Sequence, residues 1–426
     1  MYNIGCKVNF AETAQISENF SKLGYEVVDF GEKADIVFIN TCTVTHKADA
    51  DCRKMIRRAI RQNPSSFIAV GGCYAQLYPE TISKIEGVDA ILGTSEKFRI
   101  PELITDPRKQ ESPLVFISGD NDREFNPACS ADSNIRMRAV LKLQDGCDYF
   151  CSYCSVPYAR GRSRSMPFEE IIPSLKSIEA QNYNEVVLTG INLGNYKAPS
   201  GETFSDVLKA IDNSQTNLRV RISSLEPNLV NDDIIDIVAG SDNICSHFHI
   251  PLQSGSGEIL KKMYRRYDPQ YFRDLVRKIN KRIPYCGIGI DVIVGFPGET
   301  DHHFKETTDL LEDLDFSYLH VFSYSDRKIA KASTFEGKVD PKTKKQRTMA
   351  LRKLSDKKSH EFAERQLGYI KKTIPEIFVS KTGLWKGWTE NYIQVYFPGE
   401  KYLPAKEYKI ELQKFYNDGV LSKIMI

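Results

Sequence analysis

This chain has no long hydrophobic run: none of its 426 residues belongs to an apolar stretch of 18 or more, the length that a membrane-spanning helix needs. Residues 1–6 are too short and too polar for a secretory signal peptide. No internal repeat or low-complexity tract occurs. We therefore expect a cytoplasmic protein of two or three globular domains. Because the cytoplasm keeps thiols reduced, its ten cysteines favour metal ligands or free thiols over disulfides.

Net charge is also small, at +2, but it is unevenly distributed. Residues 341–426 contain 18 Lys and Arg against 9 Asp and Glu, which leaves the rest of the chain net acidic. A basic C-terminal segment indicates a polyanionic partner. A solvated, lysine-rich helix explains the same count, and charge alone does not separate the two interpretations.

The order of apolar runs and amphipathic stretches predicts an α/β fold with three parts. In residues 1–105, buried strands alternate with helices, which is typical of a doubly wound parallel sheet. Residues 106–133 are rich in Asp, Ser, Pro and Asn and are interpreted as a linker. Residues 134–360 contain six strand–helix units, too few for a closed eight-stranded barrel, so we predict an open partial barrel. Residues 361–426 change to short alternating runs, typical of a small all-β barrel.

Three cysteines, Cys147, Cys151 and Cys154, follow the first predicted strand of the partial barrel with the spacing C-x₃-C-x₂-C; we call them the local triad. This spacing allows one loop to bind three corners of a [4Fe–4S] cluster, which normally takes four thiolates. One iron then stays open, as a catalytic metal site requires. A zinc site or free thiols are the alternatives, but zinc usually takes four ligands and no histidine is near in sequence.

Another set of cysteines, Cys6, Cys42 and Cys73, is spread along the first part of the chain; we call it the dispersed triad. Each follows a predicted strand, and the carboxyl ends of parallel strands meet at one edge of a sheet, so these thiols can converge. Glycines beside Cys6 and Cys73 would let the backbone approach a cluster closely. Buried structural cysteines are the alternative. The remaining cysteines are interpreted as packing or surface thiols: Cys52, Cys129, Cys245 and Cys286.

Both cysteine patterns resemble those of a known family. The local triad is similar to the motif of the radical S-adenosylmethionine superfamily, and nearly the whole chain resembles its methylthiotransferases, most closely the subfamily that acts on threonylcarbamoyladenosine. The segments that carry the resemblance are 5–9, 40–42, 71–73, 144–148, 160–165, 223–227, 248–256 and 289–300. The resemblance implies that the local triad binds a [4Fe–4S] cluster that cleaves S-adenosylmethionine to a 5′-deoxyadenosyl radical. It also implies that the dispersed triad binds a second [4Fe–4S] cluster, which supplies or carries sulfur, and that the C-terminal part is a TRAM-like RNA-binding module.

Polar residues at successive strand ends of the predicted barrel are candidates for holding S-adenosylmethionine, because barrel enzymes place their sites at the carboxyl edge. The resemblance implies that an aromatic ring packs near the adenine and that the segment 189–192 meets the methionine amino group. A loop cap or a satisfied core group is the alternative for each residue alone. The predicted cofactor-binding residues are Tyr153, Thr189, Gly190, Asn192, Ser223, Glu226, His249, Gln253 and Asp291.

Basic and aromatic residues suggest where the substrate binds. Arg160, Arg162 and Arg164 follow the local triad, and arginine binds carboxylate and phosphate bidentately. Threonylcarbamoyladenosine carries a carboxylate, whereas isopentenyl adenosine is apolar at that point, so three arginines favour the charged nucleoside; a solvated loop is the alternative. In the C-terminal module, Lys386 and Trp388 are predicted to hold RNA backbone and to stack on unpaired bases. Packing in the module's own core is the alternative for its aromatic residues.

The sequence therefore predicts an enzyme that inserts a methylthio group at carbon 2 of threonylcarbamoyladenosine beside the tRNA anticodon. Its expected cofactors are two [4Fe–4S] clusters and S-adenosylmethionine. Its expected partners are the tRNA anticodon stem-loop and an electron donor such as flavodoxin or ferredoxin, and we expect a monomer without a membrane partner. The alternatives are a methylthiotransferase acting on isopentenyl adenosine or a ribosomal protein aspartate, or a non-enzymatic iron–sulfur redox sensor that binds RNA.

Overall fold

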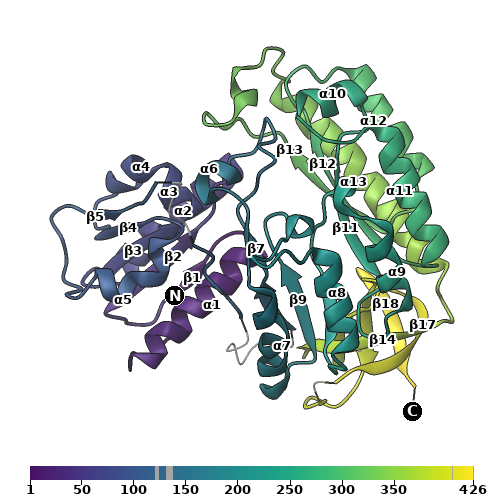
Figure 1. The fold of residues 1–426 in the computed structure, drawn as a ribbon, viewed down its shortest axis with the longest axis horizontal. Coiled ribbons are helices and arrows are strands. Elements are labelled where there is room, and N and C mark those ends of the chain that lie inside the picture. The colour runs from purple at the N-terminus through teal and green to yellow at the C-terminus, as the bar shows by residue number, and fades with distance from the viewer. Residues whose placement is uncertain (120–123, 131–137, 405, 426) are drawn as a thin grey trace.

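The computed structural model describes residues 1–119, 124–130, 138–404 and 406–425. An N-terminal parallel sheet, a central partial barrel and a C-terminal closed β-barrel follow one another along the chain. The N-terminal sheet and the C-terminal barrel lie against different sides of the central barrel (Figure 1). Among the described residues, no helix is long and apolar enough to cross a membrane.

The N-terminal sheet is parallel and its five strands lie side by side in chain order. The strands are β1 (Tyr2–Asn3), β2 (Ile36–Thr41), β3 (Phe67–Gly72), β4 (Ala90–Leu92) and β5 (Leu114–Phe116). The helices are α1 (Lys7–Lys22), α2 (His46–Gln62), α3 (Cys73–Leu77), α4 (Pro79–Ser83) and α5 (Ile100–Leu103). The order of the described strands does not reverse within the sheet, unlike that of a doubly wound sheet.

Two apolar clusters cover the two faces of this sheet. Residues of α2, α3 and α4 pack on one face, and residues of α1 and α5 pack on the other. The predicted helix between β2 and β3 is confirmed as α2, where the Thr45 hydroxyl accepts a hydrogen bond from the Ala48 amide at 3.1 Å. Such an N-cap satisfies one of the amides that the first helical turn leaves unpaired.

The central barrel contains six parallel strands, as the sequence predicts. They form two three-stranded sheets, which isolated bridges join at Val220–Ile244 and Ser224–His249. The strands are β6 (Arg138–Lys142), β9 (Glu185–Thr189), β10 (Arg219–Ile222), β11 (His247–Gln253), β12 (Gly287–Val294) and β13 (Tyr318–Ser323). A short antiparallel pair, β7 (Gln144–Asp145) and β8 (Arg164–Ser165), lies beside them. The helices are α6 (Val156–Arg160), α7 (Ile171–Ala180), α8 (Phe204–Asn213), α9 (Asp232–Gly240), α10 (Gly257–Lys262), α11 (Pro269–Arg282) and α12 (Asp301–Asp313). The largest apolar core lies between these strands and helices.

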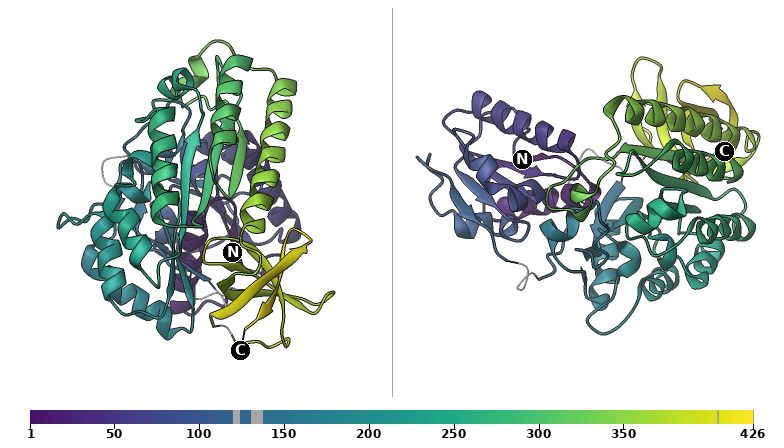
Figure 2. Two further views of the ribbon diagram at one scale, coloured as in Figure 1. Left: turned by 90° about the vertical axis from the view of Figure 1, so that its right-hand side faces the viewer. Right: turned by 90° about the horizontal axis from the view of Figure 1, so that it is seen from above.

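The long helix α13 (Pro341–Glu364) leads into the C-terminal barrel, which closes in the order β14-β15-β16-β18-β17. Its strands are β14 (Ile370–Val379), β15 (Leu384–Thr389), β16 (Gln394–Pro398), β17 (Tyr408–Tyr416) and β18 (Gly419–Ile424). Figure 2 shows these strands, in yellow, packed against the end of α13. The sequence does not predict β15 as a strand, because Gly383 just before it and Gly387 within it favour a loop.

Two buried clusters of ion pairs join the three parts. Glu12 of α1 accepts hydrogen bonds from Lys97 (2.6 Å), from Lys142 of β6 (2.9 Å) and from both terminal nitrogens of Arg160 (2.9 Å each). At the opposite end of the strands, Glu185 binds arginines of β6 and β10, which also donate to carbonyl and carboxylate oxygens of the C-terminal barrel. Buried charges need such partners, so these clusters fix how the parts are placed.

Candidate active site: two triads of cysteines

The local triad lies on the loop between β7 and α6. The Cys147 amide donates to the Gly161 carbonyl at 3.1 Å and the Cys154 amide donates to the Cys151 carbonyl at 2.9 Å. Phe150 within the loop has a φ of +48°, an uncommon value for a residue with a large side chain. The three thiols are close enough to influence one another electrostatically. One loop therefore brings three potential metal ligands to one point.

The dispersed triad also converges, although its members are far apart in sequence. Cys6 precedes α1, Cys42 directly follows β2, and Cys73 begins α3 directly after β3. Gly5, at a φ of +118°, permits this approach, because a Cβ atom there would lie 2.6 Å from Cβ and 3.0 Å from Sγ of Cys42. Electrostatic interactions connect Cys42 and Cys73 with each other and with Cys6. The geometric argument from strand ends is therefore supported by the fold.

The ionisation of these thiols is consistent with metal ligands that stay protonated until a metal binds. Burial raises the pKa of Cys147 to about 11 and also raises the pKa values of Cys151 and Cys154 above the usual range. In the dispersed triad, burial likewise raises the pKa values of Cys42 and Cys73. Metal binding would displace these protons. The positive charges of Arg160 and Lys97, which lie near Cys73, would favour the thiolate form.

Several buried polar atoms near the local triad have no hydrogen-bond partner among the described residues. Native proteins leave few such groups unsatisfied, so they indicate where a polar ligand binds. Asn192 is one of them, and its amide nitrogen lies 3.9 Å from Sγ of Cys147. Gln253 has a φ of +67°, and such strain in a residue other than glycine is concentrated at functional sites. The atoms are Asn192 Oδ1, Ser223 Oγ, Asn228 Oδ1, Gln253 Oε1 and Ser256 Oγ.

An apolar cavity of about 290 Å³ opens beside the local triad. Tyr153 and Cys154 form one wall, Gln253 and Asp291 form another, and Val44 of the N-terminal part closes it. Its position beside the local triad, with few polar groups in its walls, fits the adenosyl part of S-adenosylmethionine. Tyr153 and Gln253, which the sequence predicts to bind S-adenosylmethionine, therefore line the same cavity. Thr189 and Gly190 lie at the carboxyl end of β9, where Gly190 approaches the side chain of Gln144.

Arg265 is a site residue that the sequence analysis missed. Its side chain is 2% exposed, forms an ion pair with Glu226, and donates to Sγ of Cys151 at 3.3 Å. Arg265 also lies 3.5 Å from the Tyr153 hydroxyl. A guanidinium at this point can neutralise the charge of the thiolates and can bind a carboxylate. The signal was weak, because Arg265 lies between two helices, 111 residues after Cys154 in the printed sequence.

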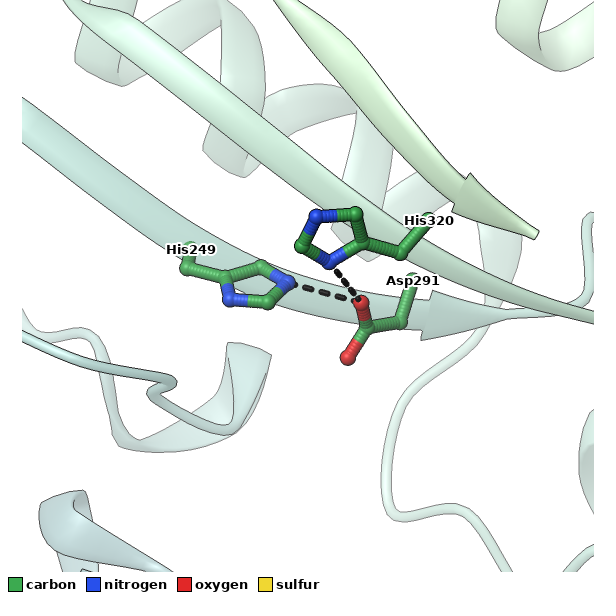
Figure 3. A group of neighbouring side chains, drawn as sticks. All are labelled: His249, Asp291 and His320. Carbon is green, nitrogen blue, oxygen red and sulfur yellow. Dashed lines mark hydrogen bonds and ion pairs between the residues drawn. The ribbon is translucent and has the colours of Figure 1, made fainter. Parts of the chain in front are cut away.

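His249, Asp291 and His320 form a compact group on three neighbouring strands (Figure 3). Asp291 Oδ1 lies 2.7 Å from Nε2 of His249 and 3.3 Å from Nδ1 of His320. Burial alone would raise the pKa of Asp291, but the hydrogen bonds with these imidazoles lower it below its usual range. The donor atoms are close enough to hold one metal ion, and the hydrogen bonds already satisfy the carboxylate. Asp291 is thus paired, and its predicted role in cofactor binding stays a prediction.

The three arginines after the local triad lie in different environments, and this corrects the sequence-based interpretation. Arg160 is 1% exposed, and its guanidinium is held by Glu12, by Asn9 (2.6 Å) and by Asp145 (2.8 Å). A substrate could reach it only by breaking the contact between the N-terminal part and the barrel. Arg164 donates to Asp145 at 2.9 Å and to backbone carbonyls, so it too is committed to the structure. Of the three arginines, only Arg162 is exposed, with 74% of its side chain accessible.

Lys386 and Trp388 lie on β15 of the C-terminal barrel. The Trp388 ring stacks on Tyr392 with centroids 4.5 Å apart, and both rings line a cavity of about 650 Å³ between this barrel and α13. Lys386 lies 3.3 Å from the Asp418 carboxylate. Trp385, in contrast, is 6% exposed and belongs to the core of the barrel. Trp385 therefore packs in the core of the barrel, whereas Trp388 and Tyr392 are half-buried in the wall of a cavity.

Comparison with known sequences covers both triads. Residues 1–93 match the family described as Uncharacterized protein family UPF0004, and residues 141–311 match the Radical SAM superfamily. Over 100% of its length, the chain is 38% identical to the threonylcarbamoyladenosine tRNA methylthiotransferase MtaB of Bacillus subtilis, of which it covers 96%. The chain belongs to the radical S-adenosylmethionine methylthiotransferase family. Membership implies a [4Fe–4S] cluster and S-adenosylmethionine, and the local triad with its unsatisfied polar neighbours fits both groups.

Further relatives cover two groups of methylthiotransferases. The protein of Aquifex aeolicus with the same name is 34% identical, over 93% of this chain and 96% of its own length. A tRNA-2-methylthio-N(6)-dimethylallyladenosine synthase of Fusobacterium nucleatum is 35% identical, over 87% and 86%. Among solved structures, the radical S-adenosylmethionine methyltransferase TsrM of Kitasatospora setae has a TM-score of 0.54 at 17% identity and covers 76% of this chain and 74% of its own. That likeness supports the fold of the methylthiotransferase.

Proposed function

We propose that this methylthiotransferase converts threonylcarbamoyladenosine beside the tRNA anticodon to its 2-methylthio derivative. The observation that carries the proposal is the presence of two cysteine triads, one on a single loop and one following three neighbouring strands, whose thiols interact electrostatically. Relatives at 38%, 34% and 33% identity are named for this substrate. A chain that forms only a radical would need one triad, whereas sulfur insertion also needs a place that holds sulfur.

The local triad would hold a [4Fe–4S] cluster and the dispersed triad would hold a second one. When bound, the clusters and S-adenosylmethionine supply the sulfur, the methyl group and a radical that removes the hydrogen at carbon 2. The chain contributes position and charge: Arg265 balances thiolate charge at the local triad, and Arg160 and Lys97 do so near Cys73. Hydrogen abstraction does not require a general base, so no proton transfer by Asp291 is needed.

Tyr153 and Gln253, which line the 290 Å³ cavity, would bind S-adenosylmethionine together with Asn192, Ser223 and Arg265, which do not line it. Asn192, Ser223 and Gln253 have buried oxygen atoms without partners among the described residues, so they can accept hydrogen bonds from amino and hydroxyl groups. Arg265 can bind the methionine carboxylate, and Tyr153 can pack on the adenine. Asp291, which lines the cavity, would face the ligand, and His249 and His320 would keep its carboxylate oriented.

The C-terminal barrel would bind the anticodon stem-loop. Trp388 and Tyr392 offer a stacked aromatic surface to unpaired bases, while Lys386 and the exposed Arg162 can contact phosphates. We further propose that the protein is a cytoplasmic monomer that receives electrons from a flavodoxin or a ferredoxin.

Iron content after anaerobic reconstitution tests the proposal. Wild type should hold about eight irons, and the variant Cys147→Ala/Cys151→Ala/Cys154→Ala should hold about four, because each cubane contains four. A matched variant, Cys6→Ala/Cys42→Ala/Cys73→Ala, should also hold about four. A wild type with about four irons that all depend on the local triad would refute the second cluster and, with it, methylthio transfer.

The related reaction on isopentenyl adenosine is the second candidate, because several relatives at 34–35% identity carry that name. Mass spectrometry of nucleosides from a deletion strain separates the two. Loss of 2-methylthio-threonylcarbamoyladenosine supports the proposed substrate, whereas loss of the isopentenyl derivative would replace it.

A further inference from the structure

A cavity of about 570 Å³ lies where all three parts of the chain meet. The N-terminal part contributes Cys6, Lys7 and Phe10, the central barrel contributes strand residues whose side chains face its interior, and the C-terminal barrel contributes three residues. The residues from the barrels are Arg138, Val140, Val187, Arg221, Glu376, Ile377 and Tyr392. Because a member of the dispersed triad lines this cavity, a molecule bound there lies beside the point at which sulfur would be held.

The cavity contains three cations, and two of them are already committed. Arg138 binds Glu376 at 2.7 Å and Glu185 at 3.5 Å. Arg221 binds Glu185 at 3.0 Å and donates to two backbone carbonyls of the C-terminal barrel at 3.0 and 3.1 Å. Their donors hold the two barrels together, as the Glu185 cluster requires. Neither arginine is available to an anionic ligand.

Lys7 is the cation that stays available. Within the described part of the chain, its ammonium group has no hydrogen-bond acceptor and no ion-pair partner, and the side chain is accessible through the cavity. The backbone of Lys7, in contrast, is held in place through the hydrogen bonds of Asn9 on the same helix. Asn9, one turn into α1, donates to the carbonyls of Ile4 and Thr41 at 3.0 Å each and accepts from Arg160 at 2.6 Å. The structure thus presents one free positive charge from a fixed point beside Cys6.

We propose that Lys7 is the specificity-determining residue of the substrate site and that it binds the carboxylate of the threonylcarbamoyl group. The inference rests on the proposed function and assigns to Lys7 the role that the sequence analysis gave to Arg160, Arg162 and Arg164.

The chemistry of the substrate supports this assignment. The threonylcarbamoyl group is attached at N6 of adenine, on the same edge of the base as carbon 2, where the methylthio group must be added. A base with carbon 2 near Cys6 therefore places its carboxylate near the residue that follows Cys6. The apolar walls formed by Phe10, Val140 and Val187 can contact the base itself. An isopentenyl group offers no anion to Lys7 and would leave the ammonium unpaired in the cavity, which disfavours that substrate.

Binding of tRNA to reconstituted protein tests the inference, with two tRNAs that differ only in the presence of the threonylcarbamoyl group. Wild type should bind the modified tRNA about tenfold or more tightly, as expected for a hydrogen bond between charged groups. Lys7→Gln should abolish this ratio, and Lys7→Arg should keep most of it. Lys22→Gln, at the other end of α1 and exposed, is the matched control and should keep the wild-type ratio. A modified tRNA whose carboxylate is methylated should bind like the unmodified one.

The outcomes separate this inference from the proposed function. A wild-type protein without any preference for the modified tRNA would contradict the proposed substrate. A wild-type preference that Lys7→Gln retains would overturn the role of Lys7 alone. If Lys7→Gln weakened the binding of both tRNAs equally, the role of Lys7 would also be overturned, because Lys7 would then contact a phosphate. Iron content must stay at the wild-type value in Lys7→Gln; loss of iron would assign the residue to the dispersed triad instead.

Discussion

The Glu12 cluster should control how firmly the N-terminal part is attached to the barrel. Each carboxylate oxygen of Glu12 accepts two hydrogen bonds from cations: Oε1 from Lys142 and Arg160, and Oε2 from Lys97 and Arg160. In Glu12→Gln, one oxygen remains as an acceptor, while the new amide group points its hydrogens at the other two donors. Two hydrogen bonds between charged groups are lost, at about 1.5–3 kcal/mol each. Breaking a buried ion pair by removing one partner costs a similar 3–5 kcal/mol or so.

Native-state hydrogen exchange measures this loss of free energy locally, at the amides of the helix that carries Glu12. The opening free energy of amides in α1 should fall by about 3–5 kcal/mol in Glu12→Gln. Glu18→Gln is the matched control on the solvent side of the same helix, where Glu18 pairs with exposed Lys22. Exposed pairs contribute little, so the control should change the opening free energy by less than about 1 kcal/mol. A change of that small size in Glu12→Gln would refute the idea that the cluster holds the two parts together.

The same cluster predicts a dependence on pH. Burial alone would raise the pKa of Glu12, but Arg160, Lys142 and Lys97 lower it well below its usual range. A carboxyl group whose pKa is lower in the folded state stabilises that state fully above its unfolded pKa, about 4.3, and loses this contribution as pH falls. The difference in opening free energy between wild type and Glu12→Gln should therefore be full at pH 6 and should shrink below about pH 4. A difference that grows on acidification would contradict the assigned charge state.

Two further predictions concern the ligands. Arg265→Met removes the ion pair with Glu226 and the positive charge beside the local triad. The Kd of S-adenosylmethionine for reconstituted protein, measured by equilibrium dialysis, should therefore rise at least about tenfold. An unchanged Kd would limit Arg265 to a structural role. Trp388→Ala exposes Tyr392 and removes a stacking surface, so tRNA affinity in a filter-binding assay should fall by about 1–3 kcal/mol, with a thermal unfolding scan as the control for folding. Unaltered affinity would place the RNA contact elsewhere on the chain.

The sequence was most informative where chemistry is encoded at short range. The spacing of Cys147, Cys151 and Cys154 confines three thiols to one loop, and no tertiary contact can change that. The dispersed triad required one additional step, the rule that parallel strands end at the same edge, and the observed strand ends support it. The six parallel strands of the central barrel were likewise readable from alternating apolar runs. In each case a periodic or local pattern determined the placement.

Charged residues were much harder to interpret, because the sequence does not say which charges meet. Arg160, Arg162 and Arg164 look alike in sequence, yet only one is exposed, since the partners of the other two come from a helix more than 100 residues away and from an adjacent strand. β15 was missed for a related reason: Gly387 within it permits close approach of the neighbouring strand β14 inside a closed barrel, and the same residue in isolation favours a turn.

This difficulty also explains why Lys7 escaped notice. As a sequence feature it is only the neighbour of a cysteine, and a single lysine on the first turn of a helix is usually solvated. Its significance depends on its neighbours: the buried clusters around Glu12 and Glu185 engage the guanidinium groups of Arg160, Arg138 and Arg221. Among the described residues that line the junction, this leaves the Lys7 ammonium group as the cation free to bind an anion. An enzyme that must distinguish a carboxylate from an apolar group at N6 needs such a free charge close to carbon 2. The buried ion pairs that fix the three parts relative to one another therefore also determine which cation is left to recognise the substrate.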